Sequence, residues 1–300
     1  MNARKILAFI IGTIITIRSS QYFYKFDHKQ KADTMKRFIL LLSAAAFLAT
    51  SCEFIPNGIK GNGEIVKEEV EVNDFSAVNV SNGFDVYLTK GDQPRVTLEV
   101  DENLLPHIKV RVEGKKLIIS SRKNIWKSRS LKAHVTYTEI EAISASGGSD
   151  IYGRNTIKTD NFSLNMSGGT DADLDIEGKH LKANLSGGSD LELEYVGESF
   201  DLSSSGGSDA ELTLRKLVDV YVNTSGGSDV SVIGESKHLT VNSSGGSDFN
   251  ARGFSVAKAK IDASGAADVR IKVTDEISVS ANGASSVHFD GGAKIVSQDI

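Results

Sequence analysis

Apolar and polar residues alternate through most of the chain beyond residue 63. Every second position of 181–185 and of 191–193, for example, is Leu or Ala, and a glycine pair lies between the two segments. An alternation with a period of two predicts extended strands with one buried face. No stretch shows the period of 3.6 that an amphipathic helix requires. The pattern therefore predicts an all-β fold.

A short string interrupts the alternation eight times. Successive copies begin 21, 19, 19, 20, 19, 20 and 18 residues apart. The string is Ser-Gly-Gly-Ser-Asp or a variant of it, and it begins at Ser146, Ser167, Ser186, Ser205, Ser225, Ser244, Ser264 and Asn282. Self-similarity at such a period is typical of a solenoid. We predict a right-handed parallel β-helix over 146–300, because the uneven intervals do not fit the hexapeptide repeat of left-handed forms.

Each part of the string has an expected role. Positions are counted here from its first Ser, which is position 0. Positions −5, −3, −1, +5 and +7 are apolar in most copies and should point inward. The glycine at +1 falls on the inward phase, and the glycine at +2 is expected to take a positive φ. The Ser or Thr at +3 should point inward, where its hydroxyl can bond the same residue type one coil away. The Asp at +4 should point outward.

Residues 64–145 are less regular but also predict strands. Segments 75–80, 84–89, 96–100, 108–112, 117–120 and 133–137 alternate or run apolar between turns. A solenoid needs its terminal faces covered to prevent pairing between exposed strand edges. We expect this region to form irregular first coils or a β cap.

The N-terminus carries the features of an export signal. In 35–51, Lys36 and Arg37 precede an apolar run and then small residues, directly before Cys52. This order resembles a bacterial lipoprotein signal, which implies acylation at Cys52, although Ala49 stands where such signals usually have Leu. An ordinary signal with an incidental cysteine is the alternative. Residues 1–34 are upstream sequence or an extended n-region, and 52–63 is expected to be a tether.

Composition removes several classes of function. The 300 residues have a net charge of −5, and those after residue 51 hold 26 basic and 37 acidic residues, or −11, which argues against nucleic acid as a partner. The single cysteine excludes a disulfide framework and a cysteine-rich zinc site, and the six histidines show no ligand spacing.

The strands and corners together resemble the head GIN domain family of auto-transporter adhesins, which is common among Bacteroidetes lipoproteins. Three segments carry the resemblance besides the glycine corners: 75–80, 83–88 and 117–119. The resemblance covers about residues 64–300. It implies a β-helical fold at the cell envelope and supplies no catalytic residues.

The outward aspartates form the first candidate site. They are Asp150, Asp171, Asp190, Asp209, Asp229, Asp248 and Asp268. One interpretation is that each carboxylate accepts hydrogen bonds from backbone N–H groups of its own turn. The alternative is a ladder of Ca²⁺ ions bridging neighbouring coils, although the nine-residue repeat of calcium-binding solenoids is absent.

The second candidate is a basic loop. Nine basic residues lie between 109 and 132, and only Glu113 opposes them, whereas 146–300 holds 13 basic and 23 acidic residues. The candidate ligand-binding residues are Arg122, Lys123, Trp126, Lys127 and Arg129. Such a patch suits an anionic glycan or a membrane head group. The alternative is a solvated loop with the Trp126 ring tucked beneath it.

Catalysis has little support in the sequence. Ser255 and Lys258 match a Ser-x-x-Lys string, but they lie in a strand pattern rather than on a helix. His180 and His238 recur at equivalent repeat positions and should face solvent. We expect a non-catalytic adhesion module on an outer-membrane lipoprotein, held by its lipid and binding a polysaccharide or an envelope protein. A β-helical polysaccharide lyase or glycosidase and an envelope scaffold are the alternatives.

Overall fold

The computed structural model describes residues 58–299. The predicted signal peptide, Cys52 and residues 1–34 lie outside this range. The described residues all belong to one compact unit. Within 58–299 no helix is long and apolar enough to cross a membrane.

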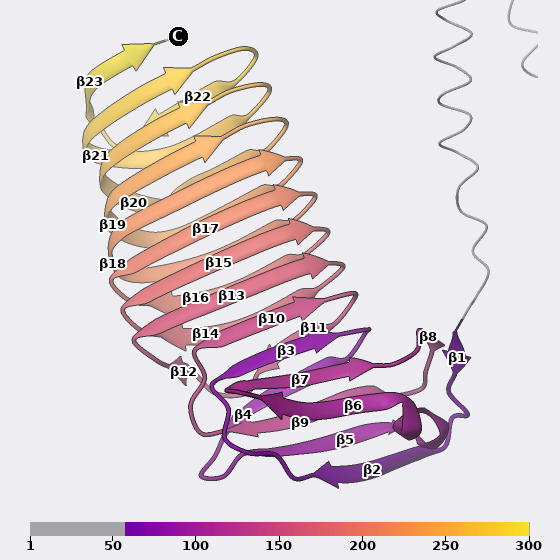
Figure 1. The fold of residues 1–300 in the computed structure, drawn as a ribbon. Helices are drawn as coiled ribbons and strands as arrows, with labels where there is room; N and C mark the ends of the chain where they lie inside the picture. Colours follow the sequence, from indigo (N-terminus) through magenta and orange to yellow (C-terminus); the bar gives the residue numbers. More distant parts are fainter. Residues whose placement is uncertain (1–57, 300) are drawn as a thin grey trace, which may run out of the picture. The chain divides into compact units, whose positions relative to one another are not determined.

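The unit is a right-handed β-solenoid, as predicted. In Figure 1 the strands nearest the viewer run to the right, the chain turns back behind them, and it climbs with each coil. The near strands form one sheet, here called the front sheet. It contains β3 (Ala77–Ser81), β10 (Ala142–Ser146), β13 (Asn161–Gly168), β15 (His180–Gly187), β17 (Ser199–Gly206) and β23 (Lys294–Asp299).

The strands that follow each glycine corner stack into the rear sheet. It contains β4 (Asp85–Lys90), β11 (Asp150–Gly153), β12 (Ile157–Lys158), β14 (Asp171–Glu177), β16 (Asp190–Val196) and β22 (Ser286–Asp290). Four longer strands contribute to both sheets, their first part to the rear and their second to the front. These are β18 (Asp209–Gly226), β19 (Asp229–Ser243), β20 (Asp248–Ala263) and β21 (Asp268–Ala281).

The glycine corners keep an unbroken register from coil to coil. Ser186 pairs with Ser205, and Asp190 pairs with Asp209, in parallel ladders without a bulge. The opposite edge of the solenoid absorbs the differences in coil length, since register shifts fall there, as between Leu214 and Leu217. Coils of unequal length can therefore stack with every corner aligned.

The predicted inward positions form the core. Phe162, Leu164 and Met166, at positions −5, −3 and −1 of one coil, are all buried, as are Leu191 and Leu193 after the next corner. Each fully buried aliphatic side chain contributes about 1.5–3 kcal/mol to folding. Stacked coils thus share one continuous apolar core instead of building one each.

The glycine at +1, not the one at +2, takes the left-handed conformation at nearly every corner. Gly206 has φ of +84°, and a Cβ there would lie 2.8 Å from the carbonyl oxygen of Gly187 in the preceding coil. Among the eight copies of the string, the prediction for +2 holds only at Gly148, where both glycines have positive φ. The +1 glycines are also exposed rather than inward, so stacked backbone, not the core, excludes a side chain there.

The hydroxyl at +3 points inward as predicted but has a different partner. Ser208 is fully buried and its Oγ donates to the carbonyl oxygen of Ser205 in its own corner, at 3.0 Å. Ser189 and Ser247 make the same bond within their corners. The predicted bond to a Ser or Thr one coil away is present at Ser247, whose Oγ lies 3.1 Å from Thr224 Oγ1, but it does not join two +3 residues. A hydroxyl three residues after a carbonyl closes its own turn without help from a neighbour.

A cap of mixed strands precedes the regular coils. In the front sheet β3 pairs with β7 (Lys116–Ser121), which pairs antiparallel with β6 (Ile108–Glu113). In the rear sheet β4 pairs with β9 (Leu131–Tyr137), followed antiparallel by β5 (Arg95–Asp101) and β2 (Ile65–Val70). A short 3₁₀ helix, η1 (Glu102–His107), follows β5. The cap continues both sheets and ends each with antiparallel strands.

The last part of the predicted tether, 52–63, lies within the fold. Ile59–Lys60 forms strand β1, which pairs in parallel with β8 (Ile125–Lys127). The buried carboxylate of Asp101 accepts hydrogen bonds from the backbone N–H groups of Gly63, Arg129 and Ser130. The chain is therefore fastened to the cap from β1 onward.

Candidate functional site

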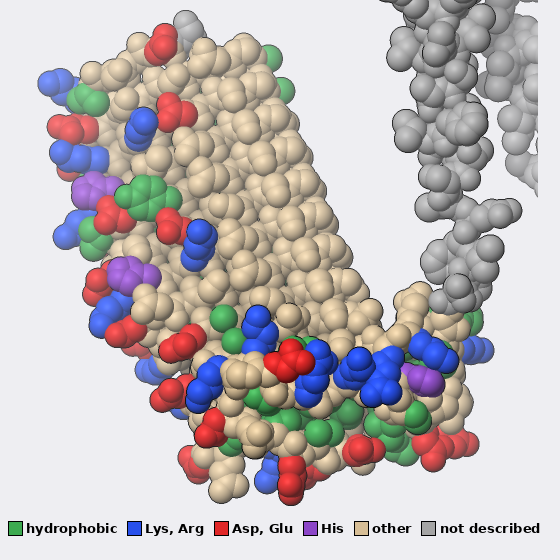
Figure 2. All heavy atoms as spheres, in the orientation of Figure 1, with side chains coloured by type: hydrophobic (Ala, Val, Ile, Leu, Met, Phe, Trp, Pro, Cys, Tyr) green, Lys and Arg blue, Asp and Glu red, His purple; other side chains and the backbone are tan. Residues whose placement is uncertain are grey.

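An uncharged surface covers the front sheet of the solenoid. In Figure 2 this area is almost free of charged and hydrophobic side chains, and a band of Lys and Arg on the cap borders it below. Two outward positions of each coil, −2 and 0, account for it. Position −2 holds Asn79, Ser144, Asn165, Asn184, Ser203, Asn223, Asn242, Asp262 and Ser280. Position 0 holds Ser81, Ser146, Ser167, Ser186, Ser205, Ser225, Ser244, Ser264 and Asn282. We call this surface the polar face.

Register turns these scattered residues into two continuous rows. Asn165 pairs with Asn184 and then Ser203 along the stack, and Ser167 pairs with Ser186. Coils in such a stack repeat about every 4.8 Å. The polar face thus presents the same hydrogen-bonding groups at one short, fixed spacing along the solenoid axis.

Side-chain hydrogen bonds order the −2 row. The amide of Asn184 donates to Oδ1 of Asn165 at 2.9 Å, and that of Asn242 donates to Oδ1 of Asn223 at 2.7 Å. A side-chain amide that donates one N–H to its neighbour still has a second N–H and an acceptor lone pair available to a ligand. The single carboxylate of the two rows, Asp262, pairs with Lys260 at 3.3 Å. The face is therefore polar and close to neutral.

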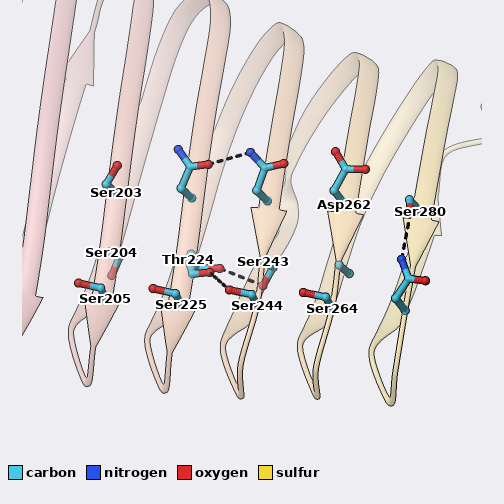
Figure 3. Close-up of a pocket in the computed structure, with 14 residues that line it drawn as sticks. Ser203, Ser204, Ser205, Thr224, Ser225, Ser243, Ser244, Asp262, Ser264 and Ser280 are labelled. Atoms are coloured by element: carbon cyan, nitrogen blue, oxygen red, sulfur yellow. Dashed lines mark hydrogen bonds between the residues drawn. The ribbon is translucent and has the colours of Figure 1, made fainter.

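Two shallow hollows run along the polar face. One, of about 390 Å³, is lined by side chains from 203–205 to 280–282, and Figure 3 shows the Ser and Asn side chains of successive coils standing in line along it. The other, of about 480 Å³, lies nearer the cap and includes Asn165 and Asn184. Beneath the first, Thr224 Oγ1 donates to Ser243 Oγ at 2.9 Å, inside the solenoid. Both hollows lie open on the surface, as a groove for an extended molecule would.

One aromatic ring adjoins these rows. Tyr221 lies two residues before Asn223 on β18, on the same side of the strand, and its side chain is 47% exposed. An exposed tyrosine offers an apolar ring face together with a hydroxyl. It gives the edge of the polar face a place where a flat apolar group can stack.

The aspartate column forms as predicted but on the other sheet. Asp190, Asp209, Asp229, Asp248 and Asp268 are in register at the start of the rear strands. The column extends into the cap, where Asp85 pairs with Asp150. The backbone N–H of Asp171 donates to the Asp150 carboxylate at 3.4 Å, so the donor belongs to the next coil rather than to the aspartate's own turn.

Crowding perturbs the first carboxylates of the column. Burial, and then the neighbouring charge of Asp85, raises the pKa of Asp150. Burial raises the pKa of Asp171, and Asp150 raises it further. The same holds for the pKa of Asp190, through burial and then Asp171 and Asp209. Among residues 58–299 no group of three or more acidic, His or Cys side chains is arranged to hold a metal ion. The calcium ladder stays a prediction.

All five predicted residues of the basic loop are exposed, but one of them also takes part in the contacts of the cap. Arg122, Lys123 and Lys127 reach solvent, and the Trp126 side chain is 42% exposed rather than tucked under the loop. Arg129 instead helps to hold the cap: its backbone N–H donates to Asp101 at 2.8 Å and its guanidinium to the Gly63 carbonyl at 3.3 Å. The structure keeps four of the five residues together as a surface.

The other residues considered for catalysis, Lys258, His180 and His238, lie on the surface of the fold. Lys258 forms an ion pair with Glu276 at 2.9 Å, on a strand, as the sequence pattern suggested. His180 and His238 are exposed, and His238 Nδ1 lies 2.9 Å from Asp219. The polar face was not predicted from the sequence. Its signal was the Asn-x-Ser or Ser-x-Ser triplet before most glycine pairs, which becomes a surface only when coils stack.

Solved structures with this architecture include proteins from Parabacteroides and Bacteroides species. A structure described as a putative adhesin from Parabacteroides merdae has a TM-score of 0.60 at 15% identity, covering 81% of this chain and 99% of its own. One described as a putative lipid binding protein from Parabacteroides distasonis has 0.58 at 19%, covering 81% and 96%. A putative adhesin from Bacteroides fragilis has 0.54 at 20%, covering 81% and 100%. These likenesses establish the fold.

The family assignment comes from the sequence. No curated protein matches the chain. A family described as "Putative auto-transporter adhesin, head GIN domain" matches residues 74–212 and 184–293, which together span most of the cap and nearly all regular coils. The chain belongs to this head GIN domain family.

Proposed function

We propose that the protein is a non-catalytic adhesion module of the cell envelope and that its polar face binds a neutral polysaccharide strand lying along the solenoid axis. The observation that carries this proposal is the pair of aligned Asn and Ser rows, ordered by hydrogen bonds such as Asn242 to Asn223. The family description, an adhesin, supports the general role.

The chemistry of the rows suits a neutral sugar chain. Amides and hydroxyls can both donate and accept, as the hydroxyls of a sugar require, and they carry no charge that an uncharged ligand would have to compensate. Each contact is weak, but equal spacing lets one chain make several contacts at once, so their affinities combine. Tyr221 adds a ring for stacking at the edge of the rows.

The shape of the solenoid favours binding over catalysis. Enzymes that act on small molecules bind them in enclosed pockets with convergent polar groups. The hollows of the polar face are instead shallow and lined by repeats of the same few side chains. An outer-membrane lipoprotein anchored at Cys52 would place such a face at the cell envelope. A protein that presents an extended strand is the second candidate partner.

The test combines a glycan array with assays of polysaccharide breakdown, using residues 53–300. We expect saturable binding to uncharged glycans without release of product. The variant Asn223→Ala/Asn242→Ala, with or without Tyr221→Ala, should weaken binding at least about tenfold, because each lost hydrogen bond costs about 0.5–1.5 kcal/mol. The matched control is Asn250→Ala, an exposed asparagine on the rear part of β20. Release of product would favour a glycosidase or lyase, and a lack of both activities would favour a scaffold.

A further inference from the structure

A compact basic and aromatic surface lies on the cap, beyond the cap end of the polar rows. It consists of Lys60, Arg122, Lys123, Trp126 and Lys127, and we call it the cap patch. All five residues are exposed. Arg111 pairs with Glu113, but within residues 58–299 none of the cap patch cations forms an ion pair. The patch therefore presents uncompensated positive charge around one indole ring.

The first described residues of the chain run alongside this patch. The Ile59 N–H donates to the Asn124 carbonyl at 2.8 Å, and the Gly61 N–H donates to that of Lys127 at 2.9 Å. A Cβ on Gly58 would lie 2.5 Å from the Asn124 oxygen and 3.4 Å from Cδ1 of Trp126. Strand β1 thus fixes residue 58 directly beside the indole.

This position limits how far the patch can be from Cys52. Five residues lie between Cys52 and Gly58, and the six steps from one to the other span at most about 21 Å in a fully extended chain. A lipid on Cys52 would keep the patch within that distance of the membrane surface. Attraction between basic residues and anionic lipid falls off over roughly 10 Å, so a patch on this short tether can come within its range, whereas one at the far end of the solenoid cannot.

We propose that the cap patch binds the anionic phospholipid head groups of the membrane in which the Cys52 lipid is inserted. Arg and Lys side chains pair with lipid phosphates, and Trp126 lies at the head-group level, where indole rings are enriched in membrane proteins. A lipid chain and a basic surface are the two signals that together give stable anchoring. The proposal rests on acylation of Cys52 and is independent of the ligand of the polar face.

The location separates this ligand from an acidic polysaccharide, which has the same charge. A polysaccharide could reach any exposed surface, including the long solenoid, whereas the cap patch is built around the residues nearest to the predicted lipid. Binding of a membrane there holds the cap against the bilayer and leaves the polar face accessible along its length.

The single tryptophan makes the test specific to the site. Because Trp126 is the only Trp in the chain, its fluorescence reports on the cap patch alone. Residues 53–300, which contain the complete compact unit, are mixed with phosphatidylcholine vesicles with or without phosphatidylglycerol. We expect a blue shift and co-sedimentation only with phosphatidylglycerol, both reversed by high salt. No shift, or an equal shift with neutral vesicles, overturns the proposal.

Matched variants test the charges. Arg122→Gln/Lys123→Gln/Lys127→Gln should lower the affinity for phosphatidylglycerol vesicles at least about tenfold. Lys182→Gln/Lys237→Gln/Arg252→Gln removes the same charge from exposed solenoid residues and should bind as the unsubstituted chain does. Equal losses in both variants would show a response to net charge and overturn the site. Tighter binding to an acidic polysaccharide than to the vesicles would overturn the assignment to lipid.

Discussion

The regular coils and the cap solve the same packing problem in different ways. Coils from Ser146 onward use one short corner repeatedly, and each corner is stabilised by the same contacts with its neighbour. The cap has no repeat, and it ends both sheets with antiparallel strands and a buried carboxylate. The difference shows that a stack propagates through local, repeated geometry, whereas its end requires particular long-range contacts.

Glycine substitutions should show the largest difference between the two regions. Gly206→Ala combines a left-handed φ with a Cβ only 2.8 Å from the Gly187 oxygen, so we expect a loss of about 2–4 kcal/mol in the free energy of unfolding. In the cap, Gly114 has φ of +63° but nothing within 4 Å of its Cβ. Gly114→Ala should therefore cost only about 1 kcal/mol. Chemical denaturation measures both.

The adjacent glycine is the control within the corner. A Cβ on Gly207 would meet only the Gly187 oxygen, at 3.8 Å, and Gly207 does not have a left-handed φ. Gly207→Ala should change stability by no more than about 0.5 kcal/mol. Equal losses of stability in Gly206→Ala and Gly207→Ala would contradict the view that the stacked backbone of the preceding coil requires glycine at +1.

The buried carboxylate of the cap should give the next largest effect. Burial of Asp101 opposes ionisation, but hydrogen bonds from the backbone N–H groups of Ser130, Arg129 and Gly63 outweigh it and hold the pKa below its usual value of 3.8. Asp101→Asn should cost about 2–3 kcal/mol at neutral pH, because hydrogen bonds to a charged group are replaced by weaker ones. Glu102→Gln, at an exposed neighbour, should cost little.

The pH dependence of this effect has a definite sign. A pKa that is lower in the folded state means that Asp101 stabilises the fold above pH 3.8 and loses that contribution as pH falls through the folded value. Denaturation from pH 7 to pH 3 should therefore show the original chain and Asp101→Asn converging in acid. Parallel curves across this range would disprove the role of the charge.

The aspartate column should give the smallest effect, and of the opposite sign. Burial and the charges of Asp171 and Asp209 raise the pKa of Asp190, so its ionised form slightly destabilises the fold. Asp190→Asn should stabilise the chain by about 0.5 kcal/mol at neutral pH, a small value because solvent screens the exposed carboxylate. The gain should shrink as pH falls through the raised pKa of the folded state and vanish below 3.8, where the carboxyl becomes protonated in both states.

A second column member tests whether crowding is the cause. Asp229 lies in the same row, but its strand continues with Ser231 where that of Asp190 continues with Glu192. Asp229→Asn should therefore change the melting temperature less than Asp190→Asn does. A large loss of stability in either variant would indicate that the carboxylates stabilise their turns after all.

The core positions were predictable because each coil repeats the same alternation of apolar and polar residues. Alternation on both sides of the corner placed Leu164 and Leu191 inward, and both are buried. The conformation of the corner was harder to predict, since Gly-Gly allows either residue to turn left-handed. The choice of +1 depends on the backbone of the preceding coil, as at Gly206 and Gly187, which a single repeat does not contain.

The candidate surfaces were predictable only in part. The loop around Trp126 was visible as a run of basic residues, but its pairing with Ile59–Lys60 joins segments more than 60 residues apart. The polar face was present as isolated Asn and Ser residues, each typical of any exposed strand. Neither the rows nor their hydrogen bonds exist until the coils are in register.

The sequence by itself determined the period, the buried positions and the column of aspartates. A repeat of near-constant length with alternating apolar side chains buries those side chains by stacking its coils. The tertiary structure decided where the stack of coils ends, which glycine of each pair takes the left-handed conformation, and which distant segments lie side by side. Those outcomes rest on contacts between distant segments, such as Asp101 with Gly63 and Ser130. Their energy depends on geometry that forms only once the chain has folded.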